Sequence, residues 1–279
     1  MADTELREEP VAEGQEEVQA PKQEDEKSGL FSTLRGRLNA EAAIVLFAIP
    51  VIVAVGFGSY LLWHATANLD SVEQSALAWS KIGTQIWEHL KLTFVSAFFV
   101  VVIAVPLGIM LTRGRARVAA PLVVGFANAG QAAPAVGLIV LFQMWLSPGF
   151  RTAVIALTLY AILPVLRNTI VGLEGVDRTL VEAGRGLGMS ASSVLLRVEL
   201  PLALPVIMAG VRTALVLLVG TATLATFIDG GGLGATLQAG ISLLRYPVIV
   251  WGAILVALLA LLIEWLGRVL ELLSRPRGV

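Results

Sequence analysis

Few residues in this sequence have the side chains that catalysis or metal binding requires. The 279 residues include no Cys and only two His, His64 and His89. Disulfides and thiolate metal sites are therefore excluded, and no H-E-x-x-H or similar metal-binding spacing is present. The sequence also lacks the G-x-x-x-x-G-K-[ST] loop that holds the phosphates of ATP. We therefore expect no catalytic residue, no metal site and no cofactor on this chain.

The interval 182–201, EAGRGLGMSASSVLLRVELP, has residues better suited to binding another protein. It mixes charge, Gly and Ser between two apolar runs. Asp177 and Thr179 are both plausible N-caps, and Thr179 with Glu182 fits the capping box T-x-x-E. This pattern predicts a short helix over about 178–187.

A second short helix is predicted after the glycines of this interval. Ser190 can cap it, and we expect it to stop before Pro201. Gly184 and Gly188 lie four apart, so they would share a face if the first helix continued that far, and glycine lets a partner's backbone approach closely. Two short helices joined at a glycine turn predict a compact knob.

The composition places this knob on a membrane protein. Hydrophobic residues make up 56% of the chain and charged residues 15%, whereas soluble domains are nearer half apolar and a quarter charged. The mean hydropathy is +0.80. Apolar runs of about 20 residues recur, which is the length that crosses the hydrocarbon core. The fold class is therefore all-α and polytopic, with about six transmembrane helices over about 42–63, 90–112, 118–146, 151–173, 204–227 and 247–272.

The third run is interrupted by Asn128, Gln131 and Pro134. We expect one long, broken helix over 118–146. A tight helical hairpin is disfavoured because each half would be too short to span.

The N-terminal segment differs in composition from the rest of the chain. Residues 1–27 hold 10 acidic and 3 basic residues, so the remainder has a net charge of +6. Such a segment cannot bury enough apolar surface to fold, which predicts a disordered acidic tail over 1–40 with a basic end beside the membrane. An N-terminal transmembrane helix over 41–64 follows, then a transmembrane domain over 90–272 and a short tail over 273–279.

The distribution of Lys and Arg predicts the orientation of the chain. With six spans, one side collects fifteen of these residues and the other side four. Because positive loops stay in the cytoplasm, both termini and the interval 174–201 are expected there.

The spacing of this interval resembles the coupling motif of ABC importer permeases, EAA-x3-G-x9-I-x-LP. The matching residues are Glu182, Ala183, Gly184, Gly188, Val198, Leu200 and Pro201. Gly184 stands where the motif has Ala, and Val198 stands where it has Ile. The resemblance implies that Glu182, Ala183, Gly184 and Gly188 dock in a groove of an ATP-hydrolysing subunit. It also implies that Leu200-Pro201 redirects the chain into the next span.

Longer strings resemble the osmoprotectant permeases, which import glycine betaine, carnitine or choline. They are LYAILPVLRNTIVGLEGVD, VELPLALPVIMAGVRTA, GGGLG, and the Q-x-x-P of Gln131 to Pro134. The resemblance implies a five-helix type I importer core plus one N-terminal helix, in a bacterial cell membrane. It implies as partners two ATP-binding subunits that hold ATP and Mg, a second permease copy or paralogue, an extracytoplasmic binding protein and the lipid bilayer, with no nucleic acid.

Polar residues within the spans are candidates for the translocation pathway. Asn128 and Gln131 share a helix face three residues apart, and with Pro134 they could open a polar stripe. Interhelical hydrogen bonding is the alternative for this pair. Tyr160 is a candidate gate, with simple packing as the alternative.

The outer end of the fifth span supplies three further pathway candidates. Asp229 either caps the helix or attracts a quaternary ammonium group, and Gly231 and Gly232 permit close packing or a re-entrant bend. Arg212 lies deeper in the same span and is expected to snorkel or to pair with a carboxylate, Glu199 being a candidate.

No clustered aromatic cage is legible in the sequence. The six Trp mostly lie near span ends, as interfacial anchors do. This pattern favours a permease that conducts its cargo while a separate binding protein recognises it.

Three other functions compete with an osmoprotectant importer. The same machine could carry an amino acid, methionine or a sulfonate. An ion-coupled secondary transporter would instead show inverted repeats and midplane carboxylates, and neither is evident. A membrane enzyme is disfavoured by the missing Cys and paired carboxylates and by the position of the two His outside the expected core spans.

Overall fold

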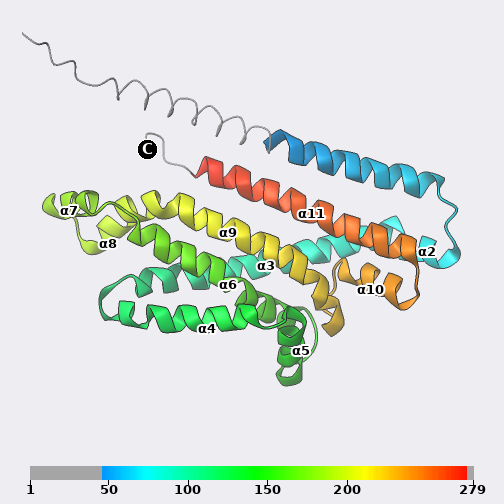
Figure 1. The fold of residues 1–279 in the computed structure, drawn as a ribbon, viewed down its shortest axis with the longest axis horizontal. Coiled ribbons are helices and arrows are strands. Elements are labelled where there is room, and N and C mark those ends of the chain that lie inside the picture. The colour runs from blue at the N-terminus through cyan, green and yellow to red at the C-terminus, as the bar shows by residue number, and fades with distance from the viewer. Residues whose placement is uncertain (1–45, 275–279) are drawn as a thin grey trace, which may run out of the picture. The chain divides into compact units, whose positions relative to one another are not determined.

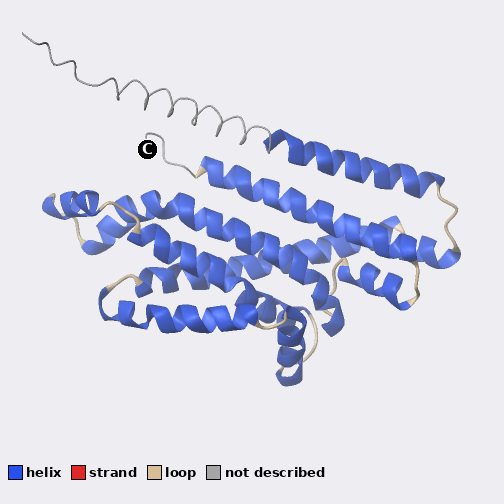
Figure 2. Cartoon of the chain, in the orientation of Figure 1, coloured by secondary structure: helices blue, strands red, loops and turns tan. Residues whose placement is uncertain are grey.

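The computed structural model describes residues 46–274, and every regular element in that range is helical (Figure 2). The predicted acidic tail over 1–40 and the residues after Ser274 lie outside the described residues. The predicted N-terminal transmembrane helix over 41–64 is described from Leu46 to Thr66. The following elements are α2 (Ser71–Ala76), α3 (Trp79–Leu111), η1 (Gly114–Ala119), α4 (Ala120–Ala132), α5 (Ala135–Trp145), α6 (Phe150–Glu174), α7 (Arg178–Gly186), α8 (Ala191–Val194), η2 (Leu195–Glu199), α9 (Leu200–Ala222), η3 (Thr223–Ile228), α10 (Gly234–Ser242) and α11 (Tyr246–Leu273).

Five helical stretches in the described part are long and apolar enough to cross a membrane, and a bent pair is a sixth candidate. This agrees with the prediction of about six transmembrane helices. The five are Leu46–Thr66, Trp79–Leu111, Phe150–Glu174, Ala191–Ile228 and Tyr246–Leu273.

The bent pair lies where the sequence predicts a broken helix. Gly114–Ala132 and Ala135–Trp145 meet at an angle of 99°, and α5 accordingly turns away from α4 in Figure 1. Ala133, just before Pro134, has an extended backbone with ψ 143. The ring of Pro134 forces this conformation on the preceding residue, which ends α4.

Helix α3 starts at Trp79, eleven residues before the predicted start at 90. The polar residues of 79–89 indicated a loop, but they lie on a helix that buries Ile82, Gln85 and His89. His89 is therefore inside the helix bundle, and the prediction that both His lie outside the core spans was wrong.

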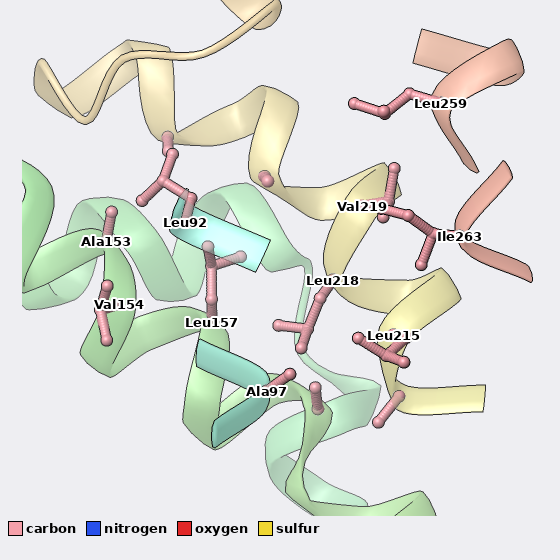
Figure 3. Packing of buried hydrophobic residues seen from close by; sticks show 14 of the residues in the cluster. Leu92, Ala97, Ala153, Val154, Leu157, Leu215, Leu218, Val219, Leu259 and Ile263 are labelled. Carbon is pink, nitrogen blue, oxygen red and sulfur yellow. The ribbon is translucent and has the colours of Figure 1, made fainter. Parts of the chain in front are cut away.

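The core forms where α3, α6, α9 and α11 pack together. Figure 3 shows buried side chains from these four helices meeting, among them Leu92, Leu157, Leu218 and Ile263. Lipid is as apolar as a leucine side chain, so helices in a membrane associate through close packing, which small residues allow. A Cβ at Gly210 would lie 2.7 Å from the Cβ of Asn168. Glycine at this position lets α9 pack directly on α6.

Helices η2 and α9 depart from the prediction. The second short helix was expected to stop before Pro201, but Ala191–Ile228 is one continuous stretch of 38 residues. Residues Leu195–Glu199 form a π-helical turn. This wider turn changes the hydrogen-bonding register, so Pro201 falls in the first turn of α9, where proline is tolerated. Leu200-Pro201 therefore does not redirect the chain.

An aromatic cluster joins the N-terminal helix to α3 and α11. The ring of Tyr60 is fully buried and lies 5.4 Å from that of Trp79 and 5.2 Å from that of Trp251. His64 and Trp63 complete the cluster, with rings 5.0 Å from Trp79 and Trp251 respectively. Three of the six Trp thus gather in one place, which the sequence did not indicate. The ring centroids lie 5.0–5.4 Å apart, which is the spacing of aromatic side chains packed against one another.

Candidate coupling and pathway sites

Helices α7 and α8 form a knob at one end of the helix bundle (Figure 1). The Asp177 carboxylate accepts a hydrogen bond of 2.9 Å from the Thr179 backbone N–H and so begins α7. Of the two predicted caps Asp177 is the correct one, and Thr179 lies within α7. The Ser190 hydroxyl accepts from the Ser193 N–H at 3.3 Å and begins α8, as predicted.

The charge on Asp177 is favoured by the same contacts that cap the helix. Hydrogen bonds from the backbone N–H and the side chain of Thr179 lower the pKa of Asp177 below its ordinary value. The carboxylate therefore stays ionised, and keeps its cap, to lower pH than an ordinary Asp.

The candidate docking residues differ in where they point. Glu182 and Ala183 are exposed on α7. Gly184 is buried, and a Cβ there would lie 3.5 Å from Val194, so it faces α8. Gly188 is exposed in the turn, with φ +81. Because α7 ends at Gly186, the predicted shared face of Gly184 and Gly188 does not form.

The second half of the motif begins the 38-residue helix. Val198 and Leu200 are half-buried, and Pro201 is exposed. Between them Glu199 is only 4% exposed. Arg113, from the turn after α3, donates to both carboxylate oxygens of Glu199, one at 3.1 Å.

A charged crevice of about 390 Å³ lies beside the motif. Arg113, Arg117 and Arg178 line it together with Glu174 and Glu199. Arg117 pairs with Glu174 at 3.0 Å, and this pair is largely exposed. The crevice therefore lies where the ends of α3 and α6 meet the start of α7.

The candidate pathway residues on α4 to α6 lie on neighbouring elements, since α4 and α5 both pack against α6. Asn128 is exposed and Gln131 half-buried on α4, and the exposed Pro134 stands at the bend. Tyr160 is half-buried on α6. Helix α5, which follows the bend at Pro134, also packs against η3, and Asp229 is the residue at which η3 ends.

The glycine-rich loop after η3 is held by α3. The Glu88 carboxylate accepts from the Gly232 N–H at 3.0 Å. His89 Nδ1 accepts from the Leu233 N–H at 3.3 Å, and its Nε2 lies 2.9 Å from the Val219 carbonyl oxygen. A Cβ at Gly231 would lie 2.7 Å from the Glu88 carboxylate. Of the two predicted roles, the packing role of these glycines is therefore the one that their contacts support.

The polar residues of α3 that hold this loop were missed by sequence reasoning. Besides Glu88 and His89, the buried Gln85 carbonyl accepts a hydrogen bond from the Thr236 hydroxyl on α10. The spacing of Gln85, Glu88 and His89 places them on one helical face, and this spacing was the available signal. Asp229, next to this loop, is exposed, and its backbone has the left-handed conformation with φ 57.

Arg212 pairs with carboxylates, but Glu199 is not among them. Its Nη1 donates to Glu264 at 2.6 Å, and its Nε lies 3.1 Å from Glu271. Both partners are on α11. A Cβ at Gly267 would lie 3.1 Å from Arg212 Cγ, so this glycine leaves room for the arginine between α9 and α11.

These features define a class before any relative is considered. A bundle of membrane-spanning helices carries a polar, exposed knob that continues directly into its longest helix. Such an arrangement is that of a polytopic membrane protein with an exposed surface suited to contact with another protein.

Comparison with known proteins places the chain within that class. Residues 104–275 match the family model of the binding-protein-dependent transport system inner membrane component. The match covers more than half of the chain, which therefore belongs to this family. The chain is thus a permease component of an ABC importer, as the resemblance implied.

Individual relatives narrow the comparison. The chain is 41% identical over 192 residues to the glycine betaine/carnitine/choline transport system permease protein OpuCB of Bacillus subtilis strain 168, covering 69% of this chain and 88% of the relative. It is 40% identical over 193 residues to the choline transport system permease protein OpuBB of the same organism, with 69% and 88% covered. Among solved structures, the inward-facing MetNI methionine ABC transporter matches with a TM-score of 0.61 and 27% identity, covering 70% of this chain and 97% of that one.

Proposed function

We propose that this chain is the membrane subunit of an ATP-driven importer for osmoprotectants such as glycine betaine, carnitine or choline. Two such permeases, identical or paralogous, would pair with two ATP-binding subunits on the cytoplasmic side. A binding protein on the other side would deliver the cargo. The chain itself would hydrolyse no ATP.

The knob formed by α7 and α8 carries this proposal. Glu182 and Ala183 are exposed on it, and Leu187 at its tip is 84% exposed. An exposed apolar side chain flanked by Gly186, Gly188 and charged residues suits a groove of another protein. Continuity with the helix Ala191–Ile228 would carry a push on the knob into the bundle.

The proposed orientation rests on charge. Three elements at the knob end contain arginines, namely η1, α7 and η2. Loops rich in Arg stay in the cytoplasm, so the knob and both termini are proposed to be cytoplasmic.

The proposed cargo rests on the relatives. Relatives at 39–41% identity are permeases named for glycine betaine, carnitine and choline transport. The methionine transporter matches through its fold at lower identity. Movement of the bundle between states open to either side would translocate the cargo, with Asn128, Gln131, Pro134, Tyr160 and Asp229 proposed to border its path.

Reversal of the charge at Glu182 tests the docking surface. The chain would be co-expressed with the ATP-binding subunit of its importer, purified and reconstituted into vesicles. Glu182→Lys is expected to reduce the co-purified ATPase and the ATP-driven uptake about tenfold or more, as loss of a charged interface contact does. Arg115→Glu, an exposed charge reversal in η1 outside the motif, serves as the matched control. Full uptake by Glu182→Lys would refute docking at α7.

Competition for uptake tests the cargo. The reconstituted system would be supplied with its binding protein, ATP and labelled glycine betaine. Unlabelled choline or carnitine is expected to compete, whereas methionine and sulfonates are not. Uptake of methionine without uptake of any quaternary amine would overturn the proposed cargo, and uptake without ATP hydrolysis would overturn the importer.

A further inference from the structure

Glu199 is a buried carboxylate inside the coupling motif. Its side chain is 6% exposed, and its ion-pair partner Arg113 is 38% exposed. Removing Arg113 would leave the Glu199 charge unpaired in a poorly hydrated place, which is strongly unfavourable. This pair therefore fixes the start of the 38-residue helix to the end of α3.

The same two helices are tied again toward the other end of α3. The His89 ring lies between the Val219 carbonyl and the Leu233 N–H, while Glu88 holds Gly232. At both contacts the paired residues are far apart in sequence, 86 positions for Arg113 and Glu199 and 130 positions for His89 and Val219. The helix Ala191–Ile228 would extend about 57 Å at 1.5 Å per residue, and α3 packs against its α9 part between the ties.

We propose that α3 and the helix Ala191–Ile228 move as one unit during transport, and that Arg113 and Glu199 are the positioning pair that makes them do so. A displacement of the knob then moves α3 as well as α9. Through Glu88 and His89 it also moves the glycine-rich loop. This inference rests on the proposed function, because it concerns how ATP-driven movement reaches the pathway.

The neighbouring pair Arg117–Glu174 offers a contrast within the same crevice. Its side chains are 61% and 43% exposed, and exposed pairs are screened by water and contribute little. Both pairs connect segments at the knob end. Only the buried pair includes a residue that lies within the interval 182–201, so only that pair is assigned a role in coupling.

The test measures cargo transported per ATP hydrolysed in vesicles that hold the full complex. Glu199→Gln keeps the shape of the side chain and removes its charge. It is expected to lower this ratio about fivefold or more, in the range of typical coupling between sites. ATP hydrolysis and the amount of co-purified ATPase should remain, because the docking face of α7 is unchanged. Arg113→Glu is expected to lower the ratio similarly.

Rescue separates a positioning role from a merely structural one. The double variant Arg113→Glu with Glu199→Arg restores an ion pair and is expected to regain most of the transport ratio. Arg117→Gln, the matched control, should leave it unchanged. If the double variant does not assemble, Glu199→Gln alone decides the question, and an unchanged ratio would overturn the inference.

The two proposals fail differently. If the wild-type complex shows no ATP-driven uptake, the proposed function fails. If the wild-type complex transports and Glu199→Gln transports with the same ratio, the importer stands and only the joint between α3 and the motif is refuted.

Discussion

Gly234 shows how a single residue limits what this bundle can accept. A Cβ at this position would lie 1.9 Å from the carbonyl oxygen of Thr223, which belongs to the backbone and cannot turn away as a side chain could. Gly220, in the exposed part of α9, has open space around its missing Cβ. We therefore expect substitution by alanine to have opposite effects on stability at these two glycines.

We expect Gly234→Ala to destabilise the protein by about 1–3 kcal/mol, because α10 must shift away from η3. Gly220→Ala should be neutral or stabilising by up to about 1 kcal/mol, since alanine favours a helix more than glycine does. The measurement is the apparent melting temperature of each purified variant in detergent. A Gly234→Ala protein as stable as the wild type would show that η3 and α10 do not pack this closely.

At the scale of elements, α7 depends on one capping residue. The Asp177 carboxylate accepts a hydrogen bond from the Thr179 N–H at the start of α7. A helix of nine residues is too short to be stable without caps or packing. The proposed docking surface therefore relies on Asp177, although the residues proposed to dock come later in the helix.

We expect Asp177→Ala to increase hydrogen exchange at the first amides of α7 and to reduce co-purification of the ATPase. Asp177→Asn is the control, since asparagine also caps helices. Exchange measured by mass spectrometry on the intact complex checks both variants. Equal protection of α7 in the alanine variant and the wild type would exclude the capping role.

The pH dependence of this cap follows from the lowered pKa of Asp177. A carboxylate whose pKa is lowered by folding stabilises the folded helix above its unfolded pKa, and this contribution is lost as pH falls through the lowered value. Binding of the ATPase is therefore expected to be insensitive to Asp177 between pH 7 and the ordinary pKa of aspartate, about 3.9. Co-purification of wild type and Asp177→Asn across that range should give parallel curves, and a wild-type loss in that range that Asp177→Asn does not share would contradict this.

At the scale of the whole described chain, the helix Leu46–Thr66 is the least buried of the five long candidate spans, with 6% of its apolar window buried. Tyr60 packs on Trp79 and Trp251, and the Trp265 indole donates to the Leu46 carbonyl at 2.7 Å. The matched family region begins only at residue 104. The N-terminal helix thus contacts the family region along α11, through the aromatic contact of Tyr60 with Trp251 and the close approach of Gly56 to Leu258.

We expect Tyr60→Ala to weaken this attachment by about 1–3 kcal/mol, from the loss of two ring pairs of about 0.5–1.5 kcal/mol each. Hydrogen exchange should rise in the helix Leu46–Thr66 and stay unchanged in α6 and α9. Leu62→Ala, at a residue 69% exposed on the same helix, is the control. ATP-driven uptake should persist in both variants, and its loss in Tyr60→Ala would show that the N-terminal helix takes part in transport.

The sequence by itself determined the membrane class, about six helices, the break at Pro134 and the capped helices of the coupling motif. These follow from properties of local stretches: apolar runs long enough to span, a proline that constrains its neighbour, and side chains that cap within three residues. The family resemblance came from the same local spacing, at Glu182, Gly188, Leu200 and Pro201.

Only the tertiary structure decided which distant polar residues meet. Glu199 pairs with Arg113 and Arg212 with Glu264, although Arg212 and Glu199 are closer in sequence. It likewise turned Gly184 inward, gathered Tyr60 with two Trp, and placed His89 against a loop 144 residues away. The physical reason is that a buried charge or polar group pairs with whichever partner the packing of the helices brings within reach. That packing depends on small residues such as Gly210 and Gly267, whose contacts lie in other helices.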